Sequence, residues 1–274
     1  MELNQIKKHW ENLANQYGQK LGATTKTSTI KKLEINALFE TIAEVNGGTT
    51  SSVDLLEVGC GNGHNCFALS EHFPNYTITG VDYVPQMITS AKEIQASKKS
   101  NKINFFVGDV LALDKHENLK EKYNIVLTNR CLINLNTLEF QLSGLEQLSK
   151  KIEKGGHLVL IENSIKSYRY QNDCREAIGL PRRTPDKYNL FIDENAYKSF
   201  AEEKLGLRLV EINDFASLHD LLLYVLLPKI NDGKVSYDHP MMNVVTEMLL
   251  GTSMKFKNRF GDFGQNRLFL FKNA

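Results

Sequence analysis

Apolar positions along this chain follow two different periods, and their alternation predicts strands and helices in turn. Short continuous apolar runs suit parallel strands that are covered on both faces. Such runs occur at residues 53–58, 76–82, 103–107, 123–128 and 157–162. Between them, apolar side chains recur at helical spacing and predict helices over residues 64–73, 85–97 and 138–152. This alternation indicates an α/β fold with a doubly wound, mainly parallel sheet.

The two ends of the chain depart from this alternation. The first seventeen residues place Leu3, Ile6, Trp10 and Leu13 on one side of an amphipathic helix, and a second helix is predicted over residues 30–45. Toward the carboxyl end, the pattern predicts a helix, a strand, a further helix and a last strand over residues 193–204, 207–213, 240–250 and 267–272. The predicted sheet therefore has seven strands.

The turn after the first strand carries three glycines at alternate positions, in the sequence Leu-Leu-Glu-Val-Gly-Cys-Gly-Asn-Gly of residues 55–63. Glycine is needed where the backbone turns with positive φ or comes close to a ligand. Asp82 ends the second predicted strand, nineteen residues after Gly63. A carboxylate there can accept two hydrogen bonds from a ribose, so the unit predicts binding of an adenosine-containing ligand.

The glycine spacing indicates which ligand. A dinucleotide-binding turn would need glycine at position 64, where this chain has His64. The pattern Glu57-x-Gly59-x-Gly61-x-Gly63 instead resembles the first motif of the class I S-adenosylmethionine-dependent methyltransferases. A carboxylate at Glu57 is tolerable beside a sulfonium or ammonium and unfavourable beside a pyrophosphate. The alternative is a doubly wound domain of another kind that merely turns on glycine.

The resemblance implies a Rossmann-like sheet with a terminal antiparallel strand, S-adenosylmethionine as the cofactor, and a set of cofactor-binding positions. Asp109 is expected near the adenine amino group and Val110 against the ring, although a Gly-Asp pair is also common in plain turns. Asn129 and Arg130 follow the fourth strand at the crevice, where Arg130 has a surface ion pair as its alternative role. The full predicted set is Tyr17, Glu57, Gly59, Cys60, Gly61, Gly63, Asp82, Tyr83, Asp109, Val110, Asn129 and Arg130.

The resemblance also suggests a division of the chain. Residues 1–50 are expected to form a helical lid, residues 51–162 the cofactor-binding core, residues 163–206 an inserted substrate cap of helix and loop, and residues 207–274 the rest of the sheet. Arginines and tyrosines alternate in the cap, which suits an anionic or sugar-like acceptor because arginine binds oxyanions and tyrosine stacks. The predicted substrate-binding residues are Tyr168, Arg169, Arg182, Arg183 and Tyr224. The alternative is an ordinary solvated segment.

Two residues are candidates for a catalytic base. Methyl transfer from a sulfonium is an in-line displacement, so the protein mainly positions the acceptor and excludes water. A base is needed only when the acceptor is a neutral hydroxyl. His219 lies beside Asp220, which can orient its ring, and Glu162 ends the fifth strand at the crevice. A buried structural histidine and a helix-capping glutamate are the respective alternatives.

Composition narrows the partners. The 274 residues carry a formal net charge of +1, so no overall field draws the protein to nucleic acid or to a membrane. The four cysteines have no zinc spacing, no metal is expected, and free thiols fit the cytoplasm. The amino terminus does not resemble a signal peptide, and the apolar run 221–227 is too short to span a bilayer.

The sequence therefore predicts methylation of a small molecule, at an oxygen of a sugar-, nucleotide- or phosphate-bearing metabolite, by a monomer or homodimer. Asn129 is not followed by the Pro-Pro-aromatic motif of amino-group methylation, and the Pro-Cys motif of cytosine methylation is absent. Two alternatives remain. One is an aminopropyl transferase of the same fold, although Asn129 and Arg130 suit a polyamine poorly. The other is a non-catalytic subunit that binds S-adenosylmethionine.

Overall fold

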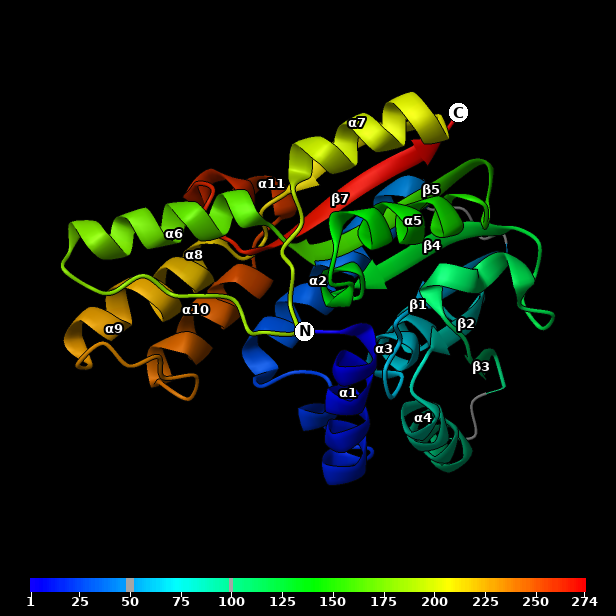
Figure 1. The fold of residues 1–274 in the computed structure, drawn as a ribbon, viewed down its shortest axis with the longest axis horizontal. Helices are drawn as coiled ribbons and strands as arrows, with labels where there is room; N and C mark the ends of the chain where they lie inside the picture. The colour runs from blue at the N-terminus through cyan, green and yellow to red at the C-terminus, as the bar shows by residue number, and fades with distance from the viewer. Residues whose placement is uncertain (48–51, 99–100) are drawn as a thin grey trace.

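A seven-stranded mixed sheet forms the centre of the protein in a computed structural model that describes residues 1–47, 52–98 and 101–274 (Figure 1). The spatial order is β3-β2-β1-β4-β5-β7-β6, in which β7 runs antiparallel to both of its neighbours. The strands are β1 (Val53–Val58), β2 (Tyr76–Asp82), β3 (Ile103–Val107), β4 (Tyr123–Asn129), β5 (Ile152–Asn163), β6 (Leu207–Asn213) and β7 (Asn266–Asn273). The predicted Rossmann-like sheet with a terminal antiparallel strand is thus confirmed.

Helices cover both faces of this sheet. They are α1 (Leu3–Tyr17), α2 (Ser28–Asn46), α3 (His64–His72), α4 (Pro85–Lys98), α5 (Leu138–Ser149), α6 (Ile165–Ala177), α7 (Glu194–Leu205), α8 (Ser217–Leu221), α9 (Leu227–Ile230), α10 (Pro240–Leu250) and α11 (Met254–Lys257). A π-helical turn over Leu222–Leu226 joins α8 to α9. Figure 1 shows α6, α8, α9 and α10 gathered at one side of the molecule, next to α2.

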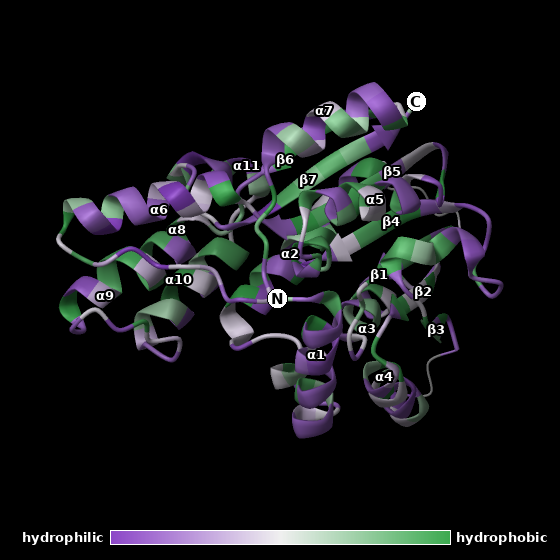
Figure 2. Cartoon of the chain, viewed as in Figure 1, coloured by the Kyte–Doolittle hydropathy of each residue, from purple (hydrophilic) through white to green (hydrophobic). Residues whose placement is uncertain are grey.

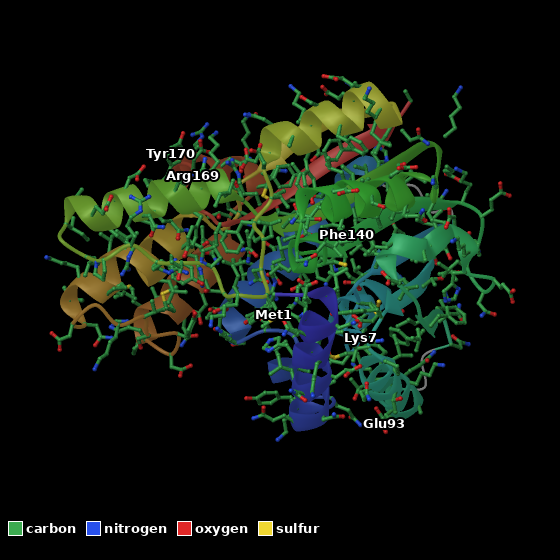
Figure 3. All side chains as sticks on the ribbon, viewed as in Figure 1. Met1, Lys7, Glu93, Phe140, Arg169 and Tyr170 are labelled. Carbon is green, nitrogen blue, oxygen red and sulfur yellow. The ribbon has the colours of Figure 1, made fainter. Side chains whose placement is uncertain are left out.

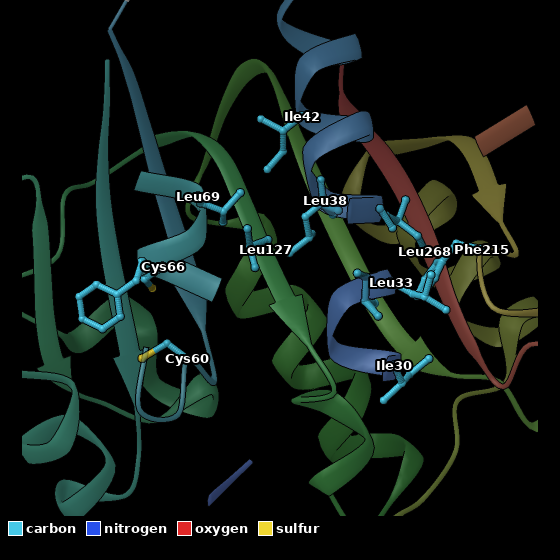
Figure 4. Close-up of a cluster of buried hydrophobic side chains, with 14 of the residues drawn as sticks. Ile30, Leu33, Leu38, Ile42, Cys60, Cys66, Leu69, Leu127, Phe215 and Leu268 are labelled. Carbon is cyan, nitrogen blue, oxygen red and sulfur yellow. The ribbon is translucent and has the colours of Figure 1, made fainter. Parts of the chain in front are cut away.

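The core lies in two layers because successive side chains of a strand point to opposite faces. On one face, Leu55 of β1 and Leu127 of β4 pack with α2, α3 and α10. Figure 4 shows Leu38 of α2 close to Leu127 in this layer. On the other face, Leu56 packs with α5 and α7. Figure 2 shows hydrophobic colouring along β7 and hydrophilic colouring on the outer turns of α6 and α7. The strands predicted from the apolar runs therefore form the middle layer of a three-layer fold, with helices on both sides.

Several element boundaries differ from the sequence prediction. The helix predicted over 138–152 ends at Ser149, and β5 begins at Ile152 rather than at residue 157 because Ile152 pairs with Tyr123 across a register shift. The inserted segment contains α6 and α7, and α7 packs on β6 and α5 within the sheet layers. Within this segment, residues 165–193 precede α7 and do not belong to the sheet.

Candidate active site

A cavity of about 1270 Å³ lies at the carboxyl ends of the central strands. Its walls come from α1, the segment before α2, the turn after β1, the ends of β2 and β4, and residues 182–191. The carboxyl ends of parallel strands are where open α/β sheets bind ligands. Most of the predicted site residues line this cavity: Tyr17, Glu57, Gly59, Cys60, Gly61, Asp82, Tyr83, Asp109, Val110, Asn129, Arg130, Tyr168, Arg182, Arg183 and Tyr224.

The glycine turn lies tightly against its neighbours. The backbone N–H groups of Gly59 and Cys60 donate to the carbonyl of Val81 at 2.7 and 3.0 Å. Gly59 and Gly61 have φ of 76° and 55°, which is the left-handed region. A Cβ on Gly59 would lie 2.6 Å from Sγ of Cys131. Both backbone conformation and lack of space therefore require glycine here.

Substitution of Gly61 tests how much of the need for glycine in this turn comes from lack of space for a side chain. Gly61 and Gly47 share nearly the same φ, 55° and 56°, but a Cβ on Gly61 would lie 2.5 Å from Cγ2 of Thr24 whereas Gly47 faces open space. We expect Gly47→Ala to lower the free energy of unfolding by about 1–2 kcal/mol, and Gly61→Ala by a further ~1–3 kcal/mol from overpacking. Urea denaturation of both variants measures the difference, and equal losses would refute the steric contact.

Asp82 completes the turn from the neighbouring strand. Its Oδ2 accepts from the N–H of Gly61 at 2.8 Å, and its Oδ1 accepts from the N–H of Val84 at 2.9 Å. Burial raises the pKa of Asp82 to about 6, against the opposing effect of these two bonds. Each carboxylate oxygen has a second lone pair. Asp82 therefore braces the turn and still has acceptor capacity.

The amino-terminal helix is joined to the same turn. The side-chain amide of Asn62 donates to the carbonyls of Gly18 and Lys20 at 2.9 and 3.0 Å. Asn62 is fully buried, so these bonds are shielded from water. They place α1 along the cavity, where Trp10 and Tyr17 form part of its lining. Lys7 of α1 and Met1, which precedes this helix, are labelled in Figure 3.

Residues 182–191 meet the amino-terminal segment across the cavity. The rings of His9 and Tyr188 stack with their centroids 4.0 Å apart, and Trp10 contacts the same tyrosine edge to face at 5.8 Å. Lys26 forms an ion pair with Asp186 at 3.4 Å. This pair is exposed on both sides and contributes little stability. The ring contacts are therefore the main connection between the two segments.

A buried ionic cluster lies beside the end of β4. Glu34 belongs to α2, and each of its two carboxylate oxygens contacts one cation and one side-chain amide. Oε1 contacts Arg130 Nε at 3.0 Å and accepts from Asn266 at 3.1 Å, while Oε2 contacts Lys31 Nζ at 2.9 Å and accepts from Asn129 at 3.2 Å. All four partners line the cavity, whereas Glu34 is fully buried behind them.

The charge balance of this cluster is positive, since two cations surround one carboxylate. Burial alone would raise the pKa of Glu34, but Arg130 and Lys31 hold it below its ordinary value. Lys31 also donates to Asn65 at 3.2 Å, and Asn65 donates to Glu57 at 2.7 Å. One continuous set of hydrogen bonds thus runs from the end of β4 to the glycine turn. Sequence analysis missed Lys31 and Glu34, which look like ordinary polar positions of α2.

The structure gives His219 a structural role. His219 is fully buried and does not line the cavity. Its Nδ1 lies 2.9 Å from Oδ1 of Asp220, and its Nε2 lies 3.2 Å from Oγ1 of Thr29. Both ring nitrogens therefore have protein partners, and the ring ties α8 to the start of α2. These contacts are those of the buried structural histidine that was the alternative, and the role as a base stays a prediction.

Glu162 is likewise a structural residue. Its Oε1 accepts from Thr128 Oγ1 and from the N–H groups of Cys131 and Leu132, and its Oε2 accepts from the N–H of Ile133 at 3.2 Å. Burial raises the pKa of Glu162 to about 7. This side chain caps the short helical turn after β4 and does not line the cavity. These contacts match the capping alternative, and the catalytic role stays a prediction.

Two further predicted residues lie outside the cavity. Arg169 is on the outer surface of α6 and is exposed, as Figure 3 shows for Arg169 and its neighbour Tyr170. Gly63 is the N-cap of α3, with φ of 84°, and acts through the shape of the turn. Asp109 and Val110 do line the cavity, and Asp109 also accepts from the N–H of Leu111 at 2.9 Å. The substrate-binding prediction is therefore withdrawn for Arg169.

The cavity fits the cationic nucleoside that the sequence suggested. Oδ1 of Asn129 is buried without a hydrogen-bond partner among the described residues, so it can accept from an ammonium group. Asp82 has spare acceptor capacity for a ribose, and the alternate glycines bring bare backbone to the cavity wall. In the described part of the chain, no group of three histidine, cysteine or acidic residues has a geometry that would hold a metal ion. No described helix is both long and apolar enough to cross a bilayer.

Comparison with known proteins identifies the family. The model of a methyltransferase domain matches residues 49–205. A malonyl-[acyl-carrier protein] O-methyltransferase of Bacillus cereus is 35% identical over 98 residues, which cover 36% of this chain and 34% of that protein. An arsenite methyltransferase of Halobacterium salinarum is 34% identical over 82 residues, covering 30% and 20%. The matched segments span well under half the length of these relatives.

Solved structures show the same architecture over nearly the whole chain. The magnesium protoporphyrin IX methyltransferase of Synechocystis with bound S-adenosylmethionine is 12% identical, covers 99% of this chain and 97% of that one, and has a TM-score of 0.59. An N-methyltransferase of Bradyrhizobium japonicum with S-adenosylhomocysteine is 14% identical over 98% of both chains, with a TM-score of 0.56. The fold is that of the class I S-adenosylmethionine-dependent methyltransferases. The chain belongs to the methyltransferase domain family, as the glycine motif predicted.

Proposed function

We propose that this protein transfers the methyl group of S-adenosylmethionine to an oxygen of a small-molecule acceptor, a sugar-, nucleotide- or phosphate-bearing metabolite. The observation that carries the proposal is the joined turn of Gly59, Gly61 and Asp82 at the edge of a cavity large enough for two ligands. In this proposal the bound cofactor supplies an electrophilic methyl group on a sulfonium. The residues of the chain bind, orient and shield the reactants.

The donor end of the cavity supports this assignment. Asp82 is proposed to accept from the ribose hydroxyls, with Asp109 and Val110 at the base. The unpartnered Oδ1 of Asn129 is proposed to accept from the ammonium of the methionine part. Tyr17 and Tyr83 cover this end from α1 and from the residue after β2. Water is thereby kept away from the sulfonium, which favours displacement by the acceptor.

The acceptor end lies between residues 182–191 and α8. Tyr168, Arg183 and Tyr224 line it, together with Asn163 and Asn266. Neither candidate base reaches it, so we infer that catalysis depends mainly on positioning. One relative named above is an O-methyltransferase of a carrier-bound malonyl group. A carboxylate acceptor is already anionic and needs no base, and such an acceptor is consistent with the arginine at this end.

Two measurements test the proposed function. Calorimetric titration with S-adenosylmethionine and S-adenosylhomocysteine should show saturable binding to one site. A screen of sugar, nucleotide and phosphate-bearing compounds by mass spectrometry should then find a product that has gained one methyl group. Transfer of an aminopropyl group from decarboxylated cofactor, or cofactor binding without any product across the screen, would favour one of the two alternatives. Tight NADH binding with no response to sulfonium compounds would refute the proposal.

A further inference from the structure

We propose that the acceptor end of the cavity contains an oxyanion site centred on Arg183, which holds a phosphate or carboxylate group of the acceptor away from the methylated oxygen. This inference rests on the proposed function, since it assigns the second part of the same cavity. The residues that form the site come from α6, from the segment after it and from the π-helical turn. They are Arg183, Arg175, Tyr168, Tyr224 and Gln171.

The guanidinium of Arg183 is held in a fixed position. It lies 3.6 Å from the ring centroid of Tyr224 and 5.2 Å from that of Tyr168. Its Nη1 donates to Oε1 of Gln171 at 3.0 Å. The backbone of Arg183 is held as well, since its N–H and carbonyl both bond the side-chain amide of Asn172, at 2.8 and 3.0 Å. A guanidinium that is already ordered loses little entropy when it binds a ligand.

The positive charge at this end has no carboxylate partner among the residues that the structure describes. Arg183 forms no ion pair with any residue that the structure describes. Arg175 is buried directly behind it and donates to the backbone carbonyls of Pro181 and Tyr224. Burial, and then the neighbouring charge of Arg183, lower the pKa of Arg175. Two close guanidinium groups without a counter-ion favour binding of an anion.

A buried hydroxyl gives independent support for a ligand here. Tyr168 is only 3% exposed, it lines the cavity, and its Oη has no hydrogen-bond partner among the described residues. Leaving such a group unpaired costs about 1–3 kcal/mol. Because phenol is a good donor to an oxyanion, the same ligand oxygen that meets Arg183 can accept from Tyr168. The site then satisfies both groups.

The neighbouring Arg182 shows why the site belongs to Arg183. Arg182 is an exposed side chain that forms ion pairs with Asp173, at 3.1 Å, and with Glu176. Its charge is already compensated on the outer side of α6, although part of its side chain reaches the cavity wall. The sequence does not distinguish these two adjacent arginines. In the structure Arg182 forms ion pairs with carboxylates, whereas Arg183 has none among the described residues and faces the cavity. Of the two arginines, we therefore assign the oxyanion contact to Arg183.

Anion titrations test the site directly. With S-adenosylhomocysteine present, inorganic phosphate and acetate are titrated separately by calorimetry at constant ionic strength in chloride. We expect saturable binding of one of them, and the anion that binds identifies the acceptor group as phosphate or carboxylate. Arg183→Gln should weaken this binding by about tenfold or more, since a charged hydrogen-bond partner is lost. Arg208→Gln makes the same charge change at an exposed position of β6 and should leave it unaltered.

Further variants separate the possible outcomes. Tyr168→Phe removes one hydroxyl without changing charge and should also weaken anion binding, which keeps the test valid if Arg183→Gln folds poorly by circular dichroism. No saturable binding of either anion, or equal binding by the Arg183→Gln, Tyr168→Phe and original proteins, would overturn the oxyanion site. Absence of S-adenosylhomocysteine binding in the original protein would instead refute the proposed function. The two failures are therefore distinguishable.

Discussion

Replacing Asp82 with alanine is expected to remove measurable binding of S-adenosylmethionine. We propose that this carboxylate accepts two hydrogen bonds from the ribose, and hydrogen bonds to a charged group contribute about 1.5–3 kcal/mol each. Loss of both weakens binding by roughly a hundredfold or more. Calorimetric titration with S-adenosylmethionine and S-adenosylhomocysteine measures the change. Unchanged affinity in a folded variant would show that the ribose lies elsewhere.

Asp82→Asn provides the control for this substitution. Alanine leaves the buried N–H groups of Gly61 and Val84 without an acceptor, so circular dichroism must establish that the variant is folded. Asparagine retains one oxygen and nearly the same shape. Because the pKa of Asp82 is raised to about 6, the charged acceptor is present above that pH and is lost as the pH falls below it. The affinity of the original protein for S-adenosylmethionine should decline on acidification. In Asp82→Asn the side chain at position 82 does not titrate, so this cause of the decline is absent.

Replacing Glu34 with glutamine is expected to destabilise the fold strongly. The change leaves Lys31 and Arg130 beside each other with no carboxylate between them, and breaking a buried ion pair in this way costs about 3–5 kcal/mol. Urea denaturation should show this loss at pH 7. Since the pKa of Glu34 is held below its ordinary value of 4.5, the stabilisation is fully present above that pH and is lost as the pH falls through the folded value.

Glu44→Gln is the matched control, because Glu44 is exposed on the same helix and the substitution changes the charge equally. We expect a loss of no more than about 0.5 kcal/mol for this surface position. If the two variants were equally stable, the contacts of Glu34 would not hold the end of β4. A glutamine at position 34 should also weaken cofactor binding, since Asn129 and Arg130 would no longer share a carboxylate.

The placement of the glycine turn and of Asp82 could be predicted from the sequence because its determinants are local. Gly59 and Gly61 follow directly after a strand, and Asp82 ends the next strand at a fixed spacing, so one βαβ unit defines their placement. The cluster around Glu34 could not be predicted, since it joins residues 95 and 232 positions apart in the chain. Such contacts depend on how α2 and β7 pack on the sheet.

The orientation of the two catalytic candidates could not be predicted for a related reason. His219 stands next to Asp220 in the sequence, which suggested an activated base, but adjacency does not determine which way the pair faces. The structure turns the ring of His219 toward Thr29 and away from the cavity. Glu162 lies at the end of β5 as predicted, yet the turn after β4 folds back over it and engages it in three N–H bonds and one hydroxyl bond. The local sequence pattern therefore predicted where each residue lies in the fold, but not the direction in which its side chain points.

The amide of Asn62 has one more consequence, for the beginning of the chain. Since it fastens the residues after α1 to the turn that follows β1, the first helix supplies one wall of the donor compartment. A shortened protein that starts after Gly18 would keep every strand of the sheet and yet leave the sulfonium open to bulk solvent. In the proposed function, the methyl donor is therefore sheltered by a helix that ends at Tyr17, outside the glycine unit and well before Gly59 in the chain.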